Sequence, residues 1–162
     1  MLYHGSNKNI KGFLKPFISF HYKPLVYATS DYLYALVRCG KFDFTKLTFK
    51  EDYDEKTFRL IELVPNAFEK VFNTDGYIYL LNEADFTHTD NLMFSEYVSN
   101  KECKIQDTIY VPNVAEEILK TNIEIIRYGQ DADYWKTVRG GKEGYLERRL
   151  KRVKIIKEKE NA

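Results

Sequence analysis

Short apolar stretches between turn-forming residues run through most of the chain, and they predict β-strands. These stretches cover residues 1–4, 25–28, 58–64, 77–81, 92–99, 103–111 and 123–128. Residues 41–50 nearly alternate between apolar and polar, but the alternation slips at Thr45-Lys46. The slip indicates either a bulge or a turn between two pieces. Only three polar residues join 92–99 to 103–111, so these two strands are expected to form an antiparallel pair.

Helical spacing of apolar residues appears in a second set of segments. The predicted helices cover a single turn within 9–15, then 32–39, 66–73, 114–120, and a tail from about 131 that is interrupted at Gly140-Gly141. Thr29-Ser30-Asp31 supplies N-cap chemistry for the second of these, and Gly40 ends it. The acidic residues 51–55 predict a surface loop. The pattern therefore predicts an α+β fold with a mostly antiparallel sheet and peripheral helices. We expect one domain over residues 1–162, with a charged helical tail.

Composition indicates the setting in which the protein works. Hydrophobic residues make up 44% of the 162 and charged residues 30%, as in an ordinary soluble domain with a core of its own. Two cysteines, with neither a C-x-x-C pair nor metal-ligand spacing, favour a reduced compartment. No secretion-signal pattern and no apolar run of membrane length occur. We therefore expect a cytoplasmic protein with no membrane partner.

Charge and ring content bear on possible ligands. The formal net charge is +1, so no overall field attracts nucleic acid or an anionic membrane. Aromatic residues reach 15%, and their rings suit sheet surfaces or the stacking of a planar ligand. The basic tail around Arg148 and Arg152 could contact RNA or another acidic partner, but interleaved glutamates favour an ordinary amphipathic surface helix. His21 and His88 are expected at the surface, and no spacing supports a metal site.

Three local motifs carry candidate chemistry. The first is Tyr3-His4-Gly5-Ser6, where glycine permits close approach to the backbone and the imidazole can donate and accept hydrogen bonds. The second is Tyr27, at the end of a predicted strand and just before a predicted helix. The third is Glu96, within Ser95-Glu96-Tyr97-Val98. Taken singly, His4 fits a strand end, Tyr27 fits a core position and Glu96 fits a solvent-facing strand position.

Taken together and in this order, the three motifs resemble the ADP-ribosyltransferase family. The similarity is to the branch with a His-Tyr-Glu motif set, which includes diphtheria toxin and the poly(ADP-ribose) polymerases. It spans roughly residues 2–111. It implies a split β-sandwich with peripheral helices, NAD as co-substrate without a metal, and transfer of ADP-ribose to an acceptor, which is a glycosyltransferase reaction. The acceptor, whether protein, nucleic acid or small molecule, is not named by the sequence.

The resemblance also implies roles for individual residues. Glu96 would hold the ribose beside the nicotinamide and offset the positive charge of an oxocarbenium-like transition state. His4 would bind the adenosine ribose, Gly5 would present backbone groups to the nicotinamide carboxamide, and Tyr27 would stack on the nicotinamide ring. Ser6, Tyr34 and Arg38 would also belong to the cofactor-binding site.

Two positions depart from the family pattern. The second aromatic of the nicotinamide sandwich falls near Arg38, and Tyr34 lies one turn earlier on the same predicted helix. Phe94 stands two residues before Glu96, where arginine-modifying relatives carry an acid or amide.

Three functions therefore remain open. The first is an NAD-dependent transferase, the second is an inactive nucleotide- or partner-binding module of the same fold, and the third is an interaction protein whose rings are all core.

Overall fold

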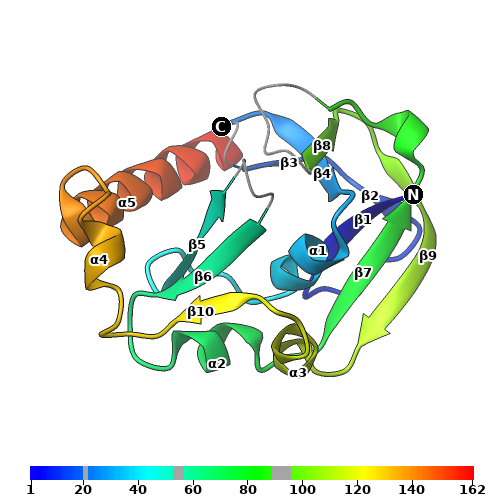
Figure 1. Cartoon of the computed structure of the whole chain (residues 1–162). Helices are drawn as coiled ribbons and strands as arrows, with labels where there is room; N and C mark the ends of the chain where they lie inside the picture. Colours follow the sequence, from blue (N-terminus) through cyan, green and yellow to red (C-terminus); the bar gives the residue numbers. More distant parts are fainter. Residues whose placement is uncertain (20–21, 53–56, 89–95) are drawn as a thin grey trace.

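The computed structural model describes residues 1–19, 22–52, 57–88 and 96–162, and it has an α+β architecture (Figure 1). The elements in chain order are β1 (Leu2–Ser6), β2 (Phe13–Leu14), β3 (Phe17–Ile18), β4 (Pro24–Thr29), α1 (Tyr32–Arg38), β5 (Leu47–Asp52), β6 (Thr57–Glu62), α2 (Ala67–Phe72), β7 (Gly76–Leu81), a 3-10 turn (Glu83–Asp85), β8 (Glu96–Ser99), β9 (Cys103–Val111), α3 (Val114–Leu119), β10 (Glu124–Ile126), α4 (Ala132–Trp135) and α5 (Gly141–Glu160).

A curled, antiparallel sheet forms the larger part of the fold. Its strands follow the order β2-β9-β7-β1-β4-β3, and β8 also pairs with β4. A smaller sheet has the order β10-β6-β5, with β10 parallel to β6. In Figure 1 the smaller sheet lies between α5 and the larger sheet, with α2 and α3 together at one end. The predicted α+β class and mostly antiparallel pairing are confirmed.

Helix α1 packs directly on β1. It begins and ends close to the residues predicted from the sequence. Asp31 is its N-cap, and the Asp31 carboxylate accepts hydrogen bonds from the backbone N–H groups of Leu33 (2.9 Å) and Tyr34 (3.4 Å). Gly5 lies under this helix. A Cβ built on Gly5 would lie 1.8 Å from the carbonyl oxygen of Ala35, so no side chain fits there. Glycine at this position therefore permits the close approach of α1 to β1.

Gly5→Ala is expected to lower the free energy of unfolding by about 3 kcal/mol, because α1 must move away from β1. Gly129→Ala is the control, since nothing lies within 4 Å of the added Cβ and only the φ of +89° strains it, at about 1 kcal/mol. Denaturant unfolding of both variants gives the comparison. Equal losses would contradict the tight α1–β1 packing.

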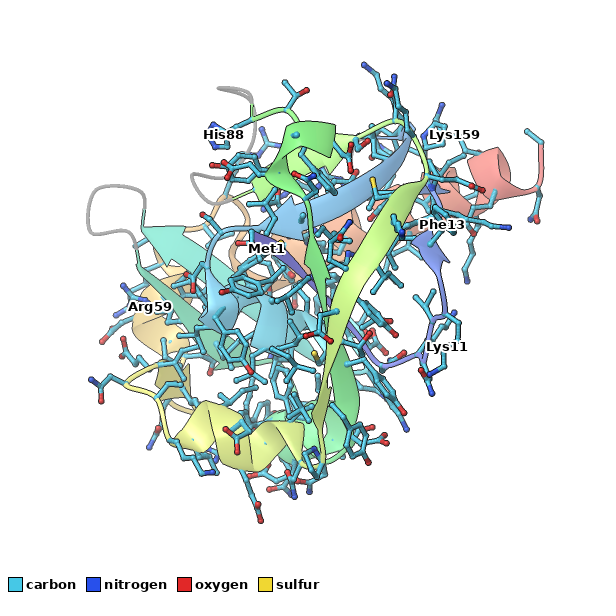
Figure 2. All side chains as sticks on the ribbon, turned by 90° about the vertical axis from the view of Figure 1, so that its right-hand side faces the viewer. Met1, Lys11, Phe13, Arg59, His88 and Lys159 are labelled. Atoms are coloured by element: carbon cyan, nitrogen blue, oxygen red, sulfur yellow. The ribbon has the colours of Figure 1, made fainter. Side chains whose placement is uncertain are left out.

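Two sequence predictions about the larger sheet are wrong. Residues 9–15 form no helical turn, because Phe13 and Leu14 pair as β2 with Lys104 and Cys103. Figure 2 shows Phe13 and the neighbouring Lys11 at the outer edge of the sheet. The second error is the expected hairpin between β8 and β9. Because β2 occupies the start of β9 on one side and β7 pairs along the other, β8 pairs with β4 instead.

Other elements appear where the pattern predicts them. The slip at Thr45-Lys46 is a turn, in which the Asp43 carboxylate accepts a hydrogen bond from the Thr45 backbone (2.9 Å). Asn113 caps α3 by accepting a hydrogen bond from the Glu116 backbone (3.1 Å). The tail forms α4 and α5 on either side of the predicted interruption. The loop predicted at residues 51–55 is wrong at its start, because residues 51 and 52 extend β5 in pairing with β6. Residues 53–55, and residues 92–95 of the predicted strand, lie outside the described residues.

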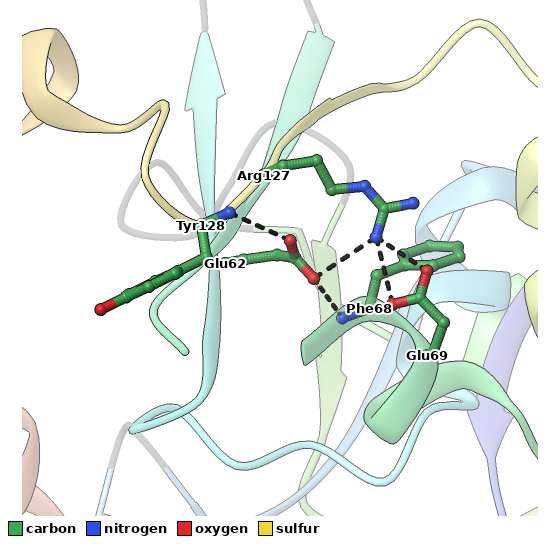
Figure 3. Close-up of polar contacts among 5 residues, drawn as sticks. All are labelled: Glu62, Phe68, Glu69, Arg127 and Tyr128. Atoms are coloured by element: carbon green, nitrogen blue, oxygen red, sulfur yellow. Dashed lines mark hydrogen bonds and ion pairs between the residues drawn. The ribbon is translucent and has the colours of Figure 1, made fainter. Parts of the chain in front are cut away.

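The buried carboxylate of Glu62 joins three parts of the fold (Figure 3). Its Oε2 accepts hydrogen bonds from the Phe68 backbone (2.9 Å) and from Arg127 (3.4 Å), and its Oε1 accepts one from the Tyr128 backbone (3.1 Å). Arg127 also binds Glu69 at 2.8 Å. Since the N-cap residue of α2 makes no side-chain cap bond, Glu62 takes over that function and ties α2 to β6 and to the chain after β10.

None of the helices in the described part of the chain is both long and apolar enough to cross a bilayer.

Candidate functional site

A cavity of about 770 Å³ opens between the larger sheet, the smaller sheet and α5. Its lining contains every site residue predicted from the sequence: His4, Gly5, Ser6, Tyr27, Tyr34, Arg38 and Glu96. The volume lies in the range of small-molecule and cofactor sites. Three segments far apart in the sequence thus contribute to one concave surface.

Strand β4 is the element that brings the three motifs together. Thr29 on β4 pairs with Tyr3 of β1 in one direction and with Glu96 of β8 in the other. Tyr27 lies two residues before Thr29, opposite Val98. Because β1 and β8 flank the same end of β4, His4 and Glu96 reach the cavity from either side of Tyr27.

The His4 imidazole has a defined tautomer. Its Nδ1 lies 2.6 Å from the carbonyl oxygen of Tyr27. A carbonyl oxygen only accepts, so Nδ1 carries the proton and donates it. Burial is the main cause of a lowered His4 pKa, and the charge of Arg38 acts in the same direction. In the neutral ring, Nε2 is then a hydrogen-bond acceptor, suited to a ligand hydroxyl.

His4 is therefore expected to make stability depend on pH. Its pKa in the folded state is lower than the unfolded value of 6.5, so its contribution is fully present above that pH. The contribution is lost as the pH falls from 6.5 toward the folded pKa, because the unfolded chain binds the proton first. The free energies of unfolding of the wild type and of His4→Asn, measured at pH values above and below 6.5, give the contribution of His4 at each pH. Parallel curves would contradict the lowered pKa.

Glu96 is held by a tyrosine. The Tyr34 hydroxyl donates a hydrogen bond to Glu96 Oε1 at 2.9 Å. Tyr34 is buried, and the rings of Phe49 and Phe58 lie nearly perpendicular to its ring, each with its centroid 5.8 Å away. Only 5% of Tyr34 is exposed, so its ring offers little surface to a ligand in the cavity. This arrangement suits the orientation of Glu96 and does not suit stacking on a planar ligand.

Tyr27 and Arg38 contact other aromatic rings. The Tyr27 ring centroid lies 5.7 Å from that of Phe17, which is 44% exposed. The Arg38 guanidinium lies over the Phe42 ring, 5.5 Å from its centroid. An arginine thus occupies the wall where the family resemblance implies a second stacking aromatic.

The cavity is strongly cationic. Among the described residues that line it, five are basic and one is acidic, Glu96. The basic ones are Lys8, Arg38, Lys50, Arg149 and Arg152. Low-dielectric walls strengthen such a field inside a cleft. The lining therefore fits a ligand that carries several negative charges.

The far wall of the cavity was missed by the sequence reasoning. It includes Phe49 and Lys50 from β5, Tyr134 from α4, and Tyr145, Arg149 and Arg152 from α5. The basic run in α5 was the available signal, but its pattern alone favoured a solvated helix face. Nothing in the sequence pattern links β5 or α4 to the three motifs.

Metal ligation has no support among the residues that the structure describes, where no group of three or more His, Cys, Asp or Glu side chains could hold an ion. His88 is exposed, as predicted, with its ring 4.9 Å from that of Tyr97, and His21 lies outside the described residues. Searches of protein-family models, curated proteins and solved structures found no match to this chain.

Proposed function

We propose that this protein is an NAD-dependent ADP-ribosyltransferase with the split β-sandwich architecture of that family. The observation that carries the proposal is the meeting of His4, Tyr27 and Glu96, from three distant segments, in one cavity of cofactor size. The family resemblance assigns these residues their roles. Free, buried cysteines fit the cytoplasmic location that we propose with it.

The proposed chemistry breaks the bond between ribose C1′ and the nicotinamide nitrogen. The electron pair of that bond leaves with nicotinamide, and positive charge develops on the ribose. Glu96, oriented by Tyr34, offsets this charge and holds a ribose hydroxyl. An acceptor nucleophile then bonds to C1′ and loses its proton to water.

Other residues bind the parts of NAD that do not react. The neutral His4 ring offers Nε2 to a hydroxyl of the adenosine ribose. Arg38 and the other lining cations attract the pyrophosphate. Tyr27 stacks on the nicotinamide ring from one side.

Calorimetric titration with NAD, together with chromatography of free nicotinamide after incubation, tests the proposal. Binding followed by nicotinamide release is the expected result. Absence of both contradicts it.

A nucleotide-binding module without catalysis is the second candidate. The buried Tyr34 ring and the arginine at position 38 favour it, because they leave the nicotinamide without a second aromatic wall. The cationic lining would bind a nucleotide whether or not the protein is a catalyst. NAD binding without nicotinamide release, with or without cell extract as a source of acceptor, would support this candidate.

A further inference from the structure

A second cavity, of about 320 Å³, lies beside the first on helix α5. Four of the described residues that line it are basic and none is acidic. The full lining is Tyr22, Tyr145, Arg148, Arg149, Lys151, Arg152 and Ile155. The basic residues belong to the segment from Arg148 to Lys154, which holds five Lys or Arg in seven positions. This cationic concentration contrasts with a net charge of +1 for the whole chain.

The two cavities share a wall. Tyr145, Arg149 and Arg152 line both the second cavity and the cavity that contains Glu96. Arg149 is fixed there, since its Nε donates a hydrogen bond to the Tyr145 hydroxyl (3.1 Å) and its guanidinium lies 4.8 Å from the Phe44 ring centroid. An anion bound on α5 therefore lies next to the candidate reaction site.

The length of the basic surface favours a chain of phosphates over a single one. The lining residues of α5 from Arg148 to Ile155 extend over about 10 Å of helix, at a rise of 1.5 Å per residue. Successive phosphates advance by about 3.4 Å along the axis of a duplex and lie farther apart in an extended single strand, so this surface can meet about two of them.

Aromatic rings beside the cations favour nucleic acid over other polyanions. Tyr22 lines the second cavity, and Phe17, 44% exposed, lines the first. Sites for single strands combine a cationic groove with rings on which bases stack. A phosphorylated peptide would bind the basic residues through its phosphates, but it has no bases to stack on these rings.

We propose that the acceptor of the ADP-ribose is a single-stranded nucleic acid that binds along α5 with its phosphates on Arg148 and Lys151, a proposal that rests on the transferase function above. An oxygen or nitrogen nucleophile of the strand forms the bond to ribose C1′ after the bond to nicotinamide has broken. The electron pair of the broken bond leaves with nicotinamide, and the proton of the nucleophile passes to water.

Fluorescence anisotropy with labelled RNA and DNA strands of about 12 nucleotides, without NAD, tests the binding step. The wild type is expected to bind with a dissociation constant of about 10⁻⁴ to 10⁻⁶ M, and affinity falls as salt rises. In Arg148→Glu/Lys151→Glu the dependence of log affinity on log salt should become shallower by about 1.4, since each lost phosphate contact removes roughly 0.7.

Lys154→Glu/Lys157→Glu is the matched control, because it makes the same charge change on the same helix at positions outside the described lining of both cavities. Equal weakening in the two double variants overturns the proposal, as does absence of strand binding by the wild type. Equal affinity for a phosphoserine peptide of the same charge, or for phosphatidylserine vesicles, also overturns it.

The transfer step is measured separately by mass spectrometry of the strand after incubation with NAD. One added ADP-ribosyl unit per strand is expected with the wild type, and less with Arg148→Glu/Lys151→Glu, while nicotinamide release without a strand stays the same in both. Nicotinamide release by the wild type with no modified strand overturns the acceptor proposal alone. Failure of nicotinamide release instead overturns the transferase function, whatever the strand-binding result.

Discussion

Glu96→Gln is expected to lower the rate of nicotinamide release from NAD by about 10² to 10³, the range found when one group that stabilises a charged transition state is removed. Glutamine keeps the size of the side chain and can still accept the hydrogen bond from Tyr34, but it carries no negative charge. NAD affinity and the unfolding midpoint should therefore stay close to those of the wild type. Chromatography of nicotinamide over time, with calorimetry on the same samples, measures both quantities.

Two further variants make this result specific. Glu124→Gln repeats the chemical change on an exposed strand residue that lies 3.9 Å from Arg59 and outside the described lining of the cavity, and it should leave the rate unchanged. Tyr34→Phe removes the hydroxyl that orients Glu96 and should lower the rate about tenfold, corresponding to roughly 1.4 kcal/mol. Full activity in Glu96→Gln would show that the charge at this position takes no part in catalysis.

Glu62→Ala is expected to lower the free energy of unfolding by about 3 to 5 kcal/mol, the typical loss when one partner of a buried ion pair is removed. The change leaves the backbone N–H groups of Phe68 and Tyr128 without the Glu62 carboxylate as acceptor, and Arg127 keeps its ion pair with Glu69. For a chain of this size the melting temperature should fall by roughly 10 °C. Thermal unfolding followed by circular dichroism measures the shift.

Glu69→Ala is the appropriate control, because it removes the other carboxylate on Arg127. The Glu69 side chain is 42% exposed, so the loss should stay below about 1 kcal/mol. Similar shifts in the two variants would mean that the buried hydrogen bonds of Glu62 contribute little.

Most elements of this fold can be predicted from the sequence because their signals are local. Asp31 and Asn113 cap helices through their own side chains, and β9 covers the predicted residues without change. The errors arise where pairing between distant segments decides the structure. Leu14 is 3% exposed because it pairs with Cys103 of β9. The residue pattern around Leu14 does not indicate that β9 is its partner, and the pattern of β9 does not indicate β2.

The same difference between local signals and contacts of distant segments decides which residues of the candidate site could be predicted. His4, Tyr27 and Glu96 could be proposed together because a family resemblance supplied the link between three local motifs. The wall formed by Tyr134, Tyr145, Arg149 and Arg152 had no such link. Its position depends on how α4 and α5 pack over the smaller sheet, which is a property of tertiary structure.

The shared wall on α5 also has a consequence for synthesis of the chain. Arg152 follows His4 by 148 positions (152 − 4), and translation at about 5 to 20 residues per second separates the synthesis of the two by roughly 7 to 30 seconds. In the later part of that interval, after Glu96 and before Arg149, the nascent chain has the strand residues of the cavity but not the basic residues of α5. The cavity therefore gains the wall formed by Tyr145, Arg149 and Arg152 only after its strand residues have been synthesised.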